Sequence, residues 1–150
     1  MTRINTIGSI HKYLTHQLRL HGIDSPQLEA RILLAHAAGI DQTRVIGYPE
    51  DILDKTTIRY LNQIMTRRKN GEPIAYITGT KEFWSLNFEV TQKTLIPRSD
   101  SETLIESILG SITNHTERLS ILDLGTGSGC LLLALLSELP NANGTGIDIS

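Results

Sequence analysis

The sequence contains few cysteines, few aromatic residues and no long hydrophobic run. A single cysteine among 150 residues excludes an intrachain disulfide, and this usage is typical of the reducing cytoplasm, where we expect the protein. No uninterrupted apolar stretch near the N-terminus is long enough for a signal peptide or a membrane span, so we expect no membrane partner. The five histidines share no ligand spacing with cysteine or clustered acids, so we predict no metal site.

An excess of charge of either sign is also missing. Fourteen Lys and Arg residues face 16 Asp and Glu residues, which gives a formal net charge of −2. A protein this close to neutrality has no general attraction for nucleic acid or anionic lipid, so we expect no direct nucleic-acid partner. With 39% hydrophobic residues, the composition is that of a globular protein with one ordinary domain, or a small domain and part of another.

Residues 1–72 carry a helical pattern. Hydrophobic residues recur there at three- and four-residue steps, in segments bounded by residues that start or stop helices. The boundaries are Gly22 after a first helix, Asp24 or Ser25 with Pro26 before a second, Gly39 after it, Asp41 before a short third, and Asp54 and Gly71 around a fourth. We therefore predict a small helical bundle. Arg67, Arg68 and Lys69 are interpreted as a solvated helix end that complements the helix dipole, with a protein or RNA contact as the alternative.

The residue pattern changes after the predicted helical bundle. Two segments, 75–79 and 83–90, are rich in aromatic and branched residues, and we expect them to be the strands of a β-hairpin. Beyond the hairpin, Ser99 and Glu102 have the spacing of a capping box at the start of a helix.

Residues 121–130 are the most informative segment. They read Ile-Leu-Asp-Leu-Gly-Thr-Gly-Ser-Gly-Cys, an apolar strand that leads through three glycines into a helix. Glycines let the backbone turn sharply and let a ligand approach its N–H groups. A dinucleotide fingerprint would need glycine where Cys130 stands, and a phosphate loop would need a lysine that is missing after Lys93. The pattern that remains is typical of methyltransferases, and we predict S-adenosylmethionine as the cofactor.

A second acid extends this prediction. Asp148 follows the next expected strand, Gly144–Ile147, at a spacing suited to holding ribose hydroxyls, although a helix N-cap is an alternative role. The predicted cofactor-binding residues are Asp123, Gly125, Thr126, Gly127, Ser128, Gly129 and Asp148. Ser120–Ser150 suffices for one β-α-β unit and no more. Because parallel sheets are stable when both faces are covered, this α/β fold looks truncated.

The whole length resembles the HemK family, the glutamine N5-methyltransferases that modify peptide chain release factors. The resemblance lies in Ser25-Pro26, Leu33-Leu34-Ala35-His36, Glu72-Pro73-Ile74-Ala75-Tyr76-Ile77, Phe83, Leu95-Ile96-Pro97-Arg98 and the segment Asp123–Gly129. The most specific of these is the Ile-Pro-Arg segment with Asp100 and Glu102 after it. The family usually reads Pro-Arg-Pro-acid-Thr-Glu there, whereas this chain has Ser99 and Ser101 in place of the second proline and the threonine.

The resemblance implies a helical substrate-docking domain (1–72), a β-hairpin linker (73–98) and the first part of a Rossmann-like S-adenosylmethionine methyltransferase domain (99–150). It implies methylation of the side-chain amide of the glutamine in the Gly-Gly-Gln loop of release factors, which are the expected partners. Arg98 has three open roles: it orients the substrate, pairs with an acid of the cofactor site, or bonds local carbonyls.

The family's catalytic motif is missing. Family members use Asn-Pro-Pro-Tyr to accept the amide N–H groups, because an amide nitrogen attacks a methyl sulfonium poorly without such help. The prolines of this chain stand at 26, 49, 73, 97 and 140, never adjacent, so we name no catalytic residue. We expect the 150 residues to transfer no methyl group alone and to bind the cofactor weakly or not at all. The alternatives are a nucleic-acid amino-methyltransferase and a non-catalytic release-factor-binding fragment.

Overall fold

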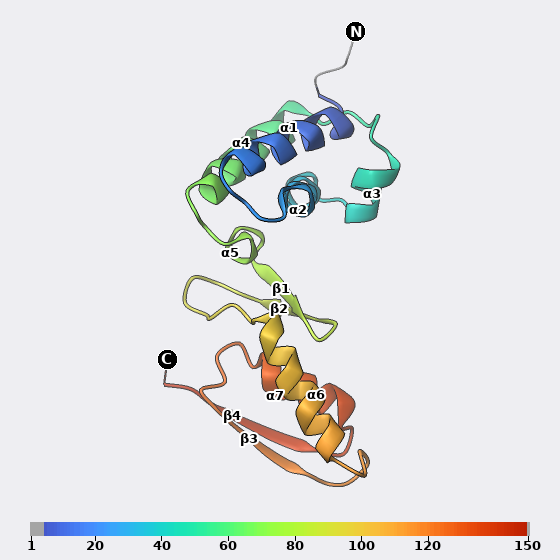
Figure 1. Ribbon diagram of the computed structural model, residues 1–150, viewed down its shortest axis with the longest axis vertical. Coiled ribbons are helices and arrows are strands. Elements are labelled where there is room, and N and C mark those ends of the chain that lie inside the picture. Colours follow the sequence, from blue (N-terminus) through green and yellow to red (C-terminus); the bar gives the residue numbers. More distant parts are fainter. Residues whose placement is uncertain (1–4, 150) are drawn as a thin grey trace. The chain divides into compact units, whose positions relative to one another are not determined.

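The helices of the first half begin and end close to the residues that the sequence marks. In the computed structural model, which describes residues 5–149, they are α1 (Ile7–Leu20), α2 (Pro26–Ala38), α3 (Gln42–Gly47) and α4 (Lys55–Lys69) (Figure 1). The Asp41 carboxylate accepts the Thr43 N–H, and Asp54 accepts N–H groups of the first turn of α4. Gly39 ends α2 in the left-handed conformation, at φ 62°. The predicted helical bundle is confirmed.

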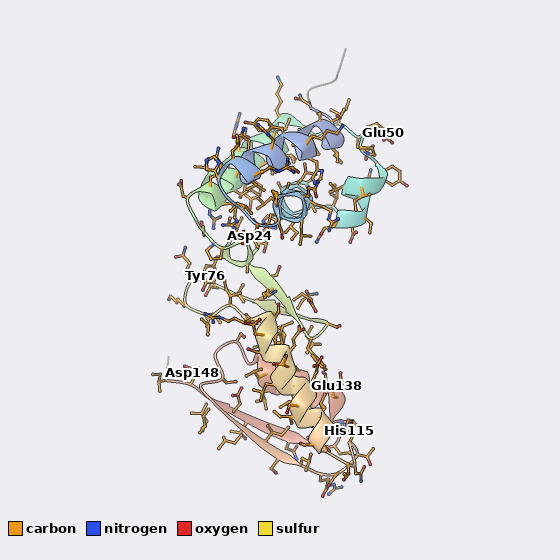
Figure 2. All side chains as sticks on the ribbon, viewed as in Figure 1. Asp24, Glu50, Tyr76, His115, Glu138 and Asp148 are labelled. Carbon is orange, nitrogen blue, oxygen red and sulfur yellow. The ribbon has the colours of Figure 1, made fainter. Side chains whose placement is uncertain are left out.

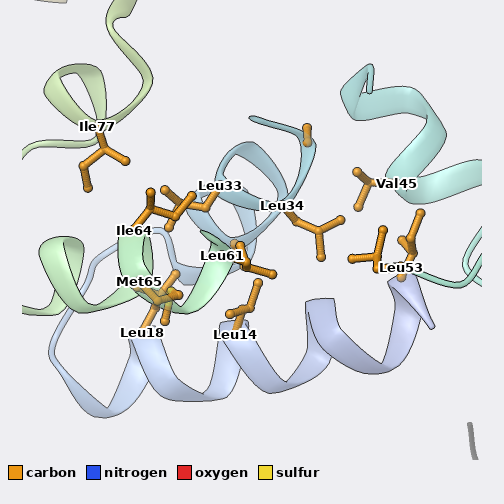
Figure 3. Packing of buried hydrophobic residues seen from close by; sticks show 13 residues of the cluster. Leu14, Leu18, Leu33, Leu34, Val45, Leu53, Leu61, Ile64, Met65 and Ile77 are labelled. Atoms are coloured by element: carbon orange, nitrogen blue, oxygen red, sulfur yellow. The ribbon is translucent and has the colours of Figure 1, made fainter. Parts of the chain in front are cut away.

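One hydrophobic core joins these helices. The second helix contacts both α1 and α4, and its Leu33 and Leu34 are fully buried between them. Figure 3 shows that α1 contributes Leu14 and Leu18 to this core, and that α4 contributes Leu61, Ile64 and Met65. Its buried members are Ile7, Leu14, Leu18, Ala30, Leu33, Leu34, Ala35, Val45, Leu53, Leu61, Ile64, Met65 and Ile77. The helical unit ends at Thr78, and a second compact unit begins at Gly79.

The basic residues at the end of α4 bind neighbouring side chains, so their interpretation as a solvated helix end is wrong for Arg68, whereas Arg67 is exposed as predicted. The Arg68 guanidinium donates to Glu29 of α2 at 2.6 Å, and both side chains are mostly buried, at 15% and 17% exposure. Arg67 forms a second ion pair, with Glu72 at 2.6 Å. Lys69 Nζ lies 3.4 Å from Gln17 Oε1. The three residues therefore connect α4 to its surroundings.

The predicted strand at 75–79 is also wrong. Ile74–Thr78 forms a short helix, α5, whose Ile77 is buried in the core of the helical unit. Pro73 precedes the helix, and the Thr78 hydroxyl donates to the Ile74 carbonyl at 3.1 Å. Burial against the bundle thus overrides the β-propensity of the segment. The hairpin itself exists one step later, as β1 (Thr80–Phe83) paired antiparallel with β2 (Leu86–Glu89).

The hairpin turn is unusual because its two residues, Trp84 and Ser85, both have positive φ, at 52° and 58°. Such a turn matches the twist of a hairpin but normally carries glycine or asparagine. Three carboxylates hold it: Glu82 accepts the Ser85 N–H at 2.6 Å, Glu102 accepts the Trp84 N–H at 3.2 Å, and Glu138 accepts the indole N–H at 2.8 Å.

The contact of Glu102 with Trp84 explains a further correction. The predicted capping box does not form, because the Glu102 carboxylate is bound to the hairpin turn. A single 3-10 turn, η1 (Ser99–Ser101), leads instead into α6 (Glu102–Ser111), and the N-cap residue of α6, Ser101, makes no side-chain cap bond.

The chain then forms the predicted β-α-β unit. Its elements are β3 (Ser120–Leu124), α7 (Cys130–Glu138) and β4 (Asn143–Ile147). The two strands are parallel, with Asp123 opposite Gly146. A core under the sheet and hairpin includes Phe83 and Phe88, whose rings meet edge to face with centroids 6.4 Å apart. This is the expected start of a Rossmann-like fold.

The two strands of this unit are largely exposed. None of the residues of β4 is buried, and Leu122, Leu124 and Ile147 are 59%, 72% and 50% exposed. A two-stranded parallel sheet normally needs helices on both faces, so the strands described here bury little of their apolar surface.

Candidate cofactor-binding site

The glycine loop between β3 and α7 forms a sharp strand-to-helix turn. Its three glycines, Gly125, Gly127 and Gly129, have φ values of 79°, 53° and 76°, which side chains strongly disfavour. The Ile147 carbonyl at the end of β4 accepts the N–H groups of Gly125, at 2.7 Å, and Thr126, at 3.1 Å. The loop is therefore anchored to the neighbouring strand.

Two carboxylates hold the loop, one in β3 and one directly after the adjacent strand β4. Asp123, in β3, accepts the Thr126 hydroxyl at 2.8 Å. Asp148, directly after β4, accepts the Gly127 N–H at 2.7 Å (Figure 2). The two predicted acids and the predicted loop thus form one arrangement. The alternative role of Asp148, as a helix N-cap, concerns residues beyond those that the structure describes.

Close packing around the loop also requires glycine in β4. A Cβ atom at Gly146 would lie 2.8 Å from Thr126 Oγ1 and 3.1 Å from Thr126 Cβ. A Cβ atom at Gly144 would lie 2.7 Å from a methyl group of Leu132 and 2.8 Å from one of Leu136. Sequence reasoning did not use this signal, although glycines inside a strand often mark a close approach.

A cavity of about 760 Å³ opens beside the loop. Among the predicted site residues, Arg98, Gly125, Thr126, Gly127, Ser128 and Asp148 line it, whereas Asp123 and Gly129 do not. Its other wall comes from Lys93–Pro97, with Ser101, Cys130 and Leu131. The volume lies within the range of small-molecule and cofactor sites. Sequence reasoning associated most of this wall with the family resemblance and not with the site.

Arg98 lies at the edge of this cavity with an exposed side chain. Its carbonyl oxygen accepts the Ser101 N–H at 3.0 Å. Within residues 5–149, its guanidinium forms neither an ion pair with a site acid nor a bond to a local carbonyl, so two of its three open roles are not formed there.

The pairing within the loop limits which ligand it accepts. The Gly127 N–H already faces the Asp148 carboxylate, so a phosphate group at this point would meet a negative charge at close range. A hydroxyl group would find an acceptor in the same carboxylate. At this point the arrangement therefore favours a hydroxyl group over a phosphate.

Two further features are absent from residues 5–149. No group of three or more His, Cys, Asp and Glu side chains is arranged to hold a metal ion there. Within the same range, no helix combines the length and the hydropathy that a membrane span requires.

Comparison with known proteins agrees with the resemblance. Residues 9–79 match the domain family described as the PrmC N-terminal domain. A release factor glutamine methyltransferase of Vibrio cholerae is 45% identical over 144 residues, which cover 96% of this chain and 50% of that protein. The protein of the same name in Escherichia coli is 42% identical over 130 residues, 87% of this chain and 46% of that protein.

A third relative differs in length. A bifunctional methyltransferase of Rickettsia bellii is 39% identical over 170 aligned residues, 95% of this chain and 31% of that protein. The chain spans about half the length of the release factor glutamine methyltransferases that it matches. With similarity to these proteins over nearly all of its length, the chain belongs to the family of the release factor glutamine methyltransferases, the HemK family.

Proposed function

We propose that the cavity beside the glycine loop binds S-adenosylmethionine. We also propose that the chain forms part of a methyltransferase that acts on the Gly-Gly-Gln glutamine of peptide chain release factors. The observation that carries the proposal is the loop, whose Gly127 N–H and Thr126 hydroxyl are held by acids from two adjacent strands. The names of the relatives support the release factor as substrate.

Each predicted residue has a role in this proposal. Asp148 accepts ribose hydroxyls, and Gly125, Gly127 and Gly129 let the ligand approach the backbone. Asp123 acts through Thr126, because it does not line the cavity and instead fixes that side chain. Ser128 lines the cavity beside Gly127, and Arg98 orients the substrate at the cavity edge.

In this proposal, methyl transfer needs groups of this chain and also groups that the chain does not contain. S-adenosylmethionine supplies the methyl group when bound, and the chain positions it. The groups that would accept hydrogen bonds from the amide N–H groups of the glutamine belong to the Asn-Pro-Pro-Tyr motif, which is absent from this sequence. We therefore propose that residues 1–150 alone transfer no methyl group. We also propose cytoplasmic action on a protein substrate, with neither membrane nor nucleic acid as partner.

One observation favours a second candidate function. The helical unit has a continuous core that includes α5, whereas the second unit leaves its strands exposed. A fragment that binds release factor without catalysis is therefore the alternative. In both cases we propose residues 1–72 as the docking domain, 73–98 as the linker and 99–150 as the first part of the methyltransferase domain.

A chimaera tests the proposal. Residues 1–150 are joined to the remaining part of the Vibrio cholerae relative, and transfer of labelled methyl groups to purified release factor is measured. We expect transfer by the chimaera and none by residues 1–150 alone. Asp148→Ala should weaken cofactor binding by about 10- to 100-fold, the effect of losing a charged hydrogen bond, while Glu106→Gln, an exposed change in α6, should not.

Each other outcome has a distinct meaning. Label in RNA or DNA but not in release factor would favour the nucleic-acid amino-methyltransferase. A chimaera that binds release factor but transfers nothing would favour the docking fragment. Transfer by residues 1–150 alone would contradict the division of chemistry proposed here.

A further inference from the structure

A second hollow lies within the helical unit, between α1 and α4. It is a groove of about 350 Å³ with a hydrocarbon floor formed by Ile10 and Leu14 of α1 and Ile58 and Leu61 of α4. Leu14 and Leu61 approach each other from the two helices (Figure 3). The remaining lining residues are Tyr13, which is 58% exposed, and the uncharged polar residues Asn5, Ser9 and Asn62. No carboxylate lines this groove.

The two helices that form the groove carry charge of one sign. Together α1 and α4 contain seven Lys and Arg residues and no Asp or Glu. Arg67 and Arg68 are neutralised by Glu72 and Glu29. The other five are Lys12, Arg19, Lys55, Arg59 and Lys69, and among the residues that the structure describes none of these five forms an ion pair.

Helical spacing places two of these cations near residues that line the groove, although neither cation is itself a lining residue. Lys55 is three residues before Ile58, and Arg59 is three residues before Asn62, so each shares a face of α4 with a lining residue. Both side chains are exposed. The groove therefore has an apolar floor and a basic edge.

The formal net charge of −2 does not reveal that the two units differ in charge. Residues 1–78 contain ten Lys and Arg against seven Asp and Glu, whereas residues 79–150 contain four against nine. The helical unit is thus basic and the second unit acidic. A partner that binds the helical unit through its charge must be acidic.

We infer that the groove between α1 and α4 binds an amphipathic helix of a protein partner, apolar on the face that enters the groove and acidic on its flanks. The walls are helices whose backbone groups already bond within themselves, so they offer no strand edge to an extended peptide. A helix satisfies its own backbone and presents apolar side chains at three- and four-residue steps. RNA would meet the cations but would leave the hydrocarbon floor uncovered.

The inference rests on the proposed function in taking release factor as that partner. The test uses the whole 150-residue chain with two probes, unmethylated release factor and a fluorescein-labelled designed helix with leucines on one face and glutamates on its flanks. Tyr13→Ala removes an exposed ring at the groove. Tyr48→Ala is its matched control, since Tyr48, the C-cap residue after α3, is 55% exposed and lies outside the groove. Arg59→Glu reverses a charge at the groove edge, and Arg31→Glu makes the same change on α2.

We expect Tyr13→Ala to weaken binding about tenfold or more, as for an aromatic anchor, with an unchanged circular dichroism spectrum because the side chain is exposed. Arg59→Glu should weaken binding about three- to tenfold, and the loss should shrink at high salt. The two control variants should bind like the unmodified chain.

The outcomes separate this inference from the proposed function. If release factor binds and both groove variants leave its affinity unchanged, the inference is overturned while the proposed partner stands. If only the designed helix binds, and the groove variants weaken it, the groove is supported and release factor is not its partner. If neither probe binds, or if a labelled RNA oligonucleotide binds more tightly than the designed helix, the inference is overturned.

Discussion

The two units bury hydrophobic side chains to very different extents. The helical unit has 13 buried hydrophobic residues in one cluster, drawn from each of its helices and the loop before α4, whereas the cluster of the second unit has six. Leucines of β3 remain exposed there, at 59% for Leu122 and 72% for Leu124. Helices can enclose a core with a few short elements, while a parallel sheet needs a layer on each face. Among the described residues, the helical unit therefore encloses its core, whereas the second unit leaves its strands exposed.

The helix ends differ in the same direction. Side chains of Thr6, Asp41 and Asp54 cap α1, α3 and α4, whereas Ser25 at the N-cap of α2 makes no side-chain bond. In the second unit, Ser101 and Gly129 stand at the N-caps of α6 and α7 without a side-chain bond. Glycine at the second of these positions follows from the turn into α7, where φ is 76°. Because the loop requires glycine at this position, α7 has no side-chain cap.

Matched leucine truncations give the largest expected contrast. Leu18→Ala removes a side chain with no exposed surface from the core of the helical unit, so it should lower the free energy of unfolding by about 2–5 kcal/mol. Leu122→Ala in β3 should change it by no more than about 0.5 kcal/mol, because the side chain is already 59% exposed. Urea unfolding followed by circular dichroism measures both. An equal loss for the two variants would mean that the strands are covered in solution.

Glycine substitutions in β4 sharpen the comparison inside the second unit. Gly146→Ala places a methyl group against the Thr126 side chain and displaces the hydroxyl that Asp123 holds, so it should cost about 1–3 kcal/mol. Gly144→Ala meets its closest contacts at leucine methyl groups, which can move, and should cost less. Hydrogen exchange of the Gly125 and Thr126 amides reports the change at the loop. Faster exchange in Gly144→Ala than in Gly146→Ala would contradict this order.

The ion pairs of α4 test how far the helical unit depends on polar contacts. Arg68→Met leaves the Glu29 carboxylate, 17% exposed, without its partner, and should cost about 1–2 kcal/mol. Arg67→Met breaks a pair whose arginine is 43% exposed, and should cost less than about 1 kcal/mol. The two midpoints of urea unfolding decide the order. Equal effects would show that water screens the Glu29 pair as well.

These contacts also show what could be read from the sequence. Helix ends depend on neighbouring residues, so Asp41, Asp54 and Gly39 identified them correctly. The strand predicted at 75–79 was wrong because Ile77 is buried in a core assembled from distant helices. The capping box was wrong because Glu102 bonds to Trp84, 18 residues earlier.

The candidate site likewise has one part that was predictable from the sequence and one part that was not. The glycine loop and its acids were predictable because the pattern from Asp123 to Gly129 is local, and Asp148 follows the next strand. The cavity wall at Lys93–Pro97 and the groove between α1 and α4 arise from packing between segments distant in sequence. The roles of the site residues in binding a cofactor stay predictions.

The smallest expected effect is a pH dependence confined to the helical unit. A hydrogen bond from the Thr43 side chain lowers the pKa of Asp41, and one from the Thr57 N–H lowers the pKa of Asp54. A carboxyl group whose pKa is lower in the folded chain stabilises it fully above the unfolded pKa, about 3.9, and loses that contribution as the pH falls through the folded value. The urea midpoint of the helical unit should therefore decline as the pH falls below about 4.

Asparagine variants isolate these two carboxylates from other titrating groups. Asn accepts the same N–H bonds at a helix N-cap but does not titrate, so Asp41→Asn and Asp54→Asn should keep the helices capped and flatten the decline with pH. The exposure of both groups to solvent keeps the effect small. The N-cap residues of α6 and α7 are Ser101 and Gly129, so neither asparagine variant should change the unfolding of the second unit. An undiminished decline in the double variant would assign the acid sensitivity to groups other than these two caps, and would remove capping from the differences between the two units.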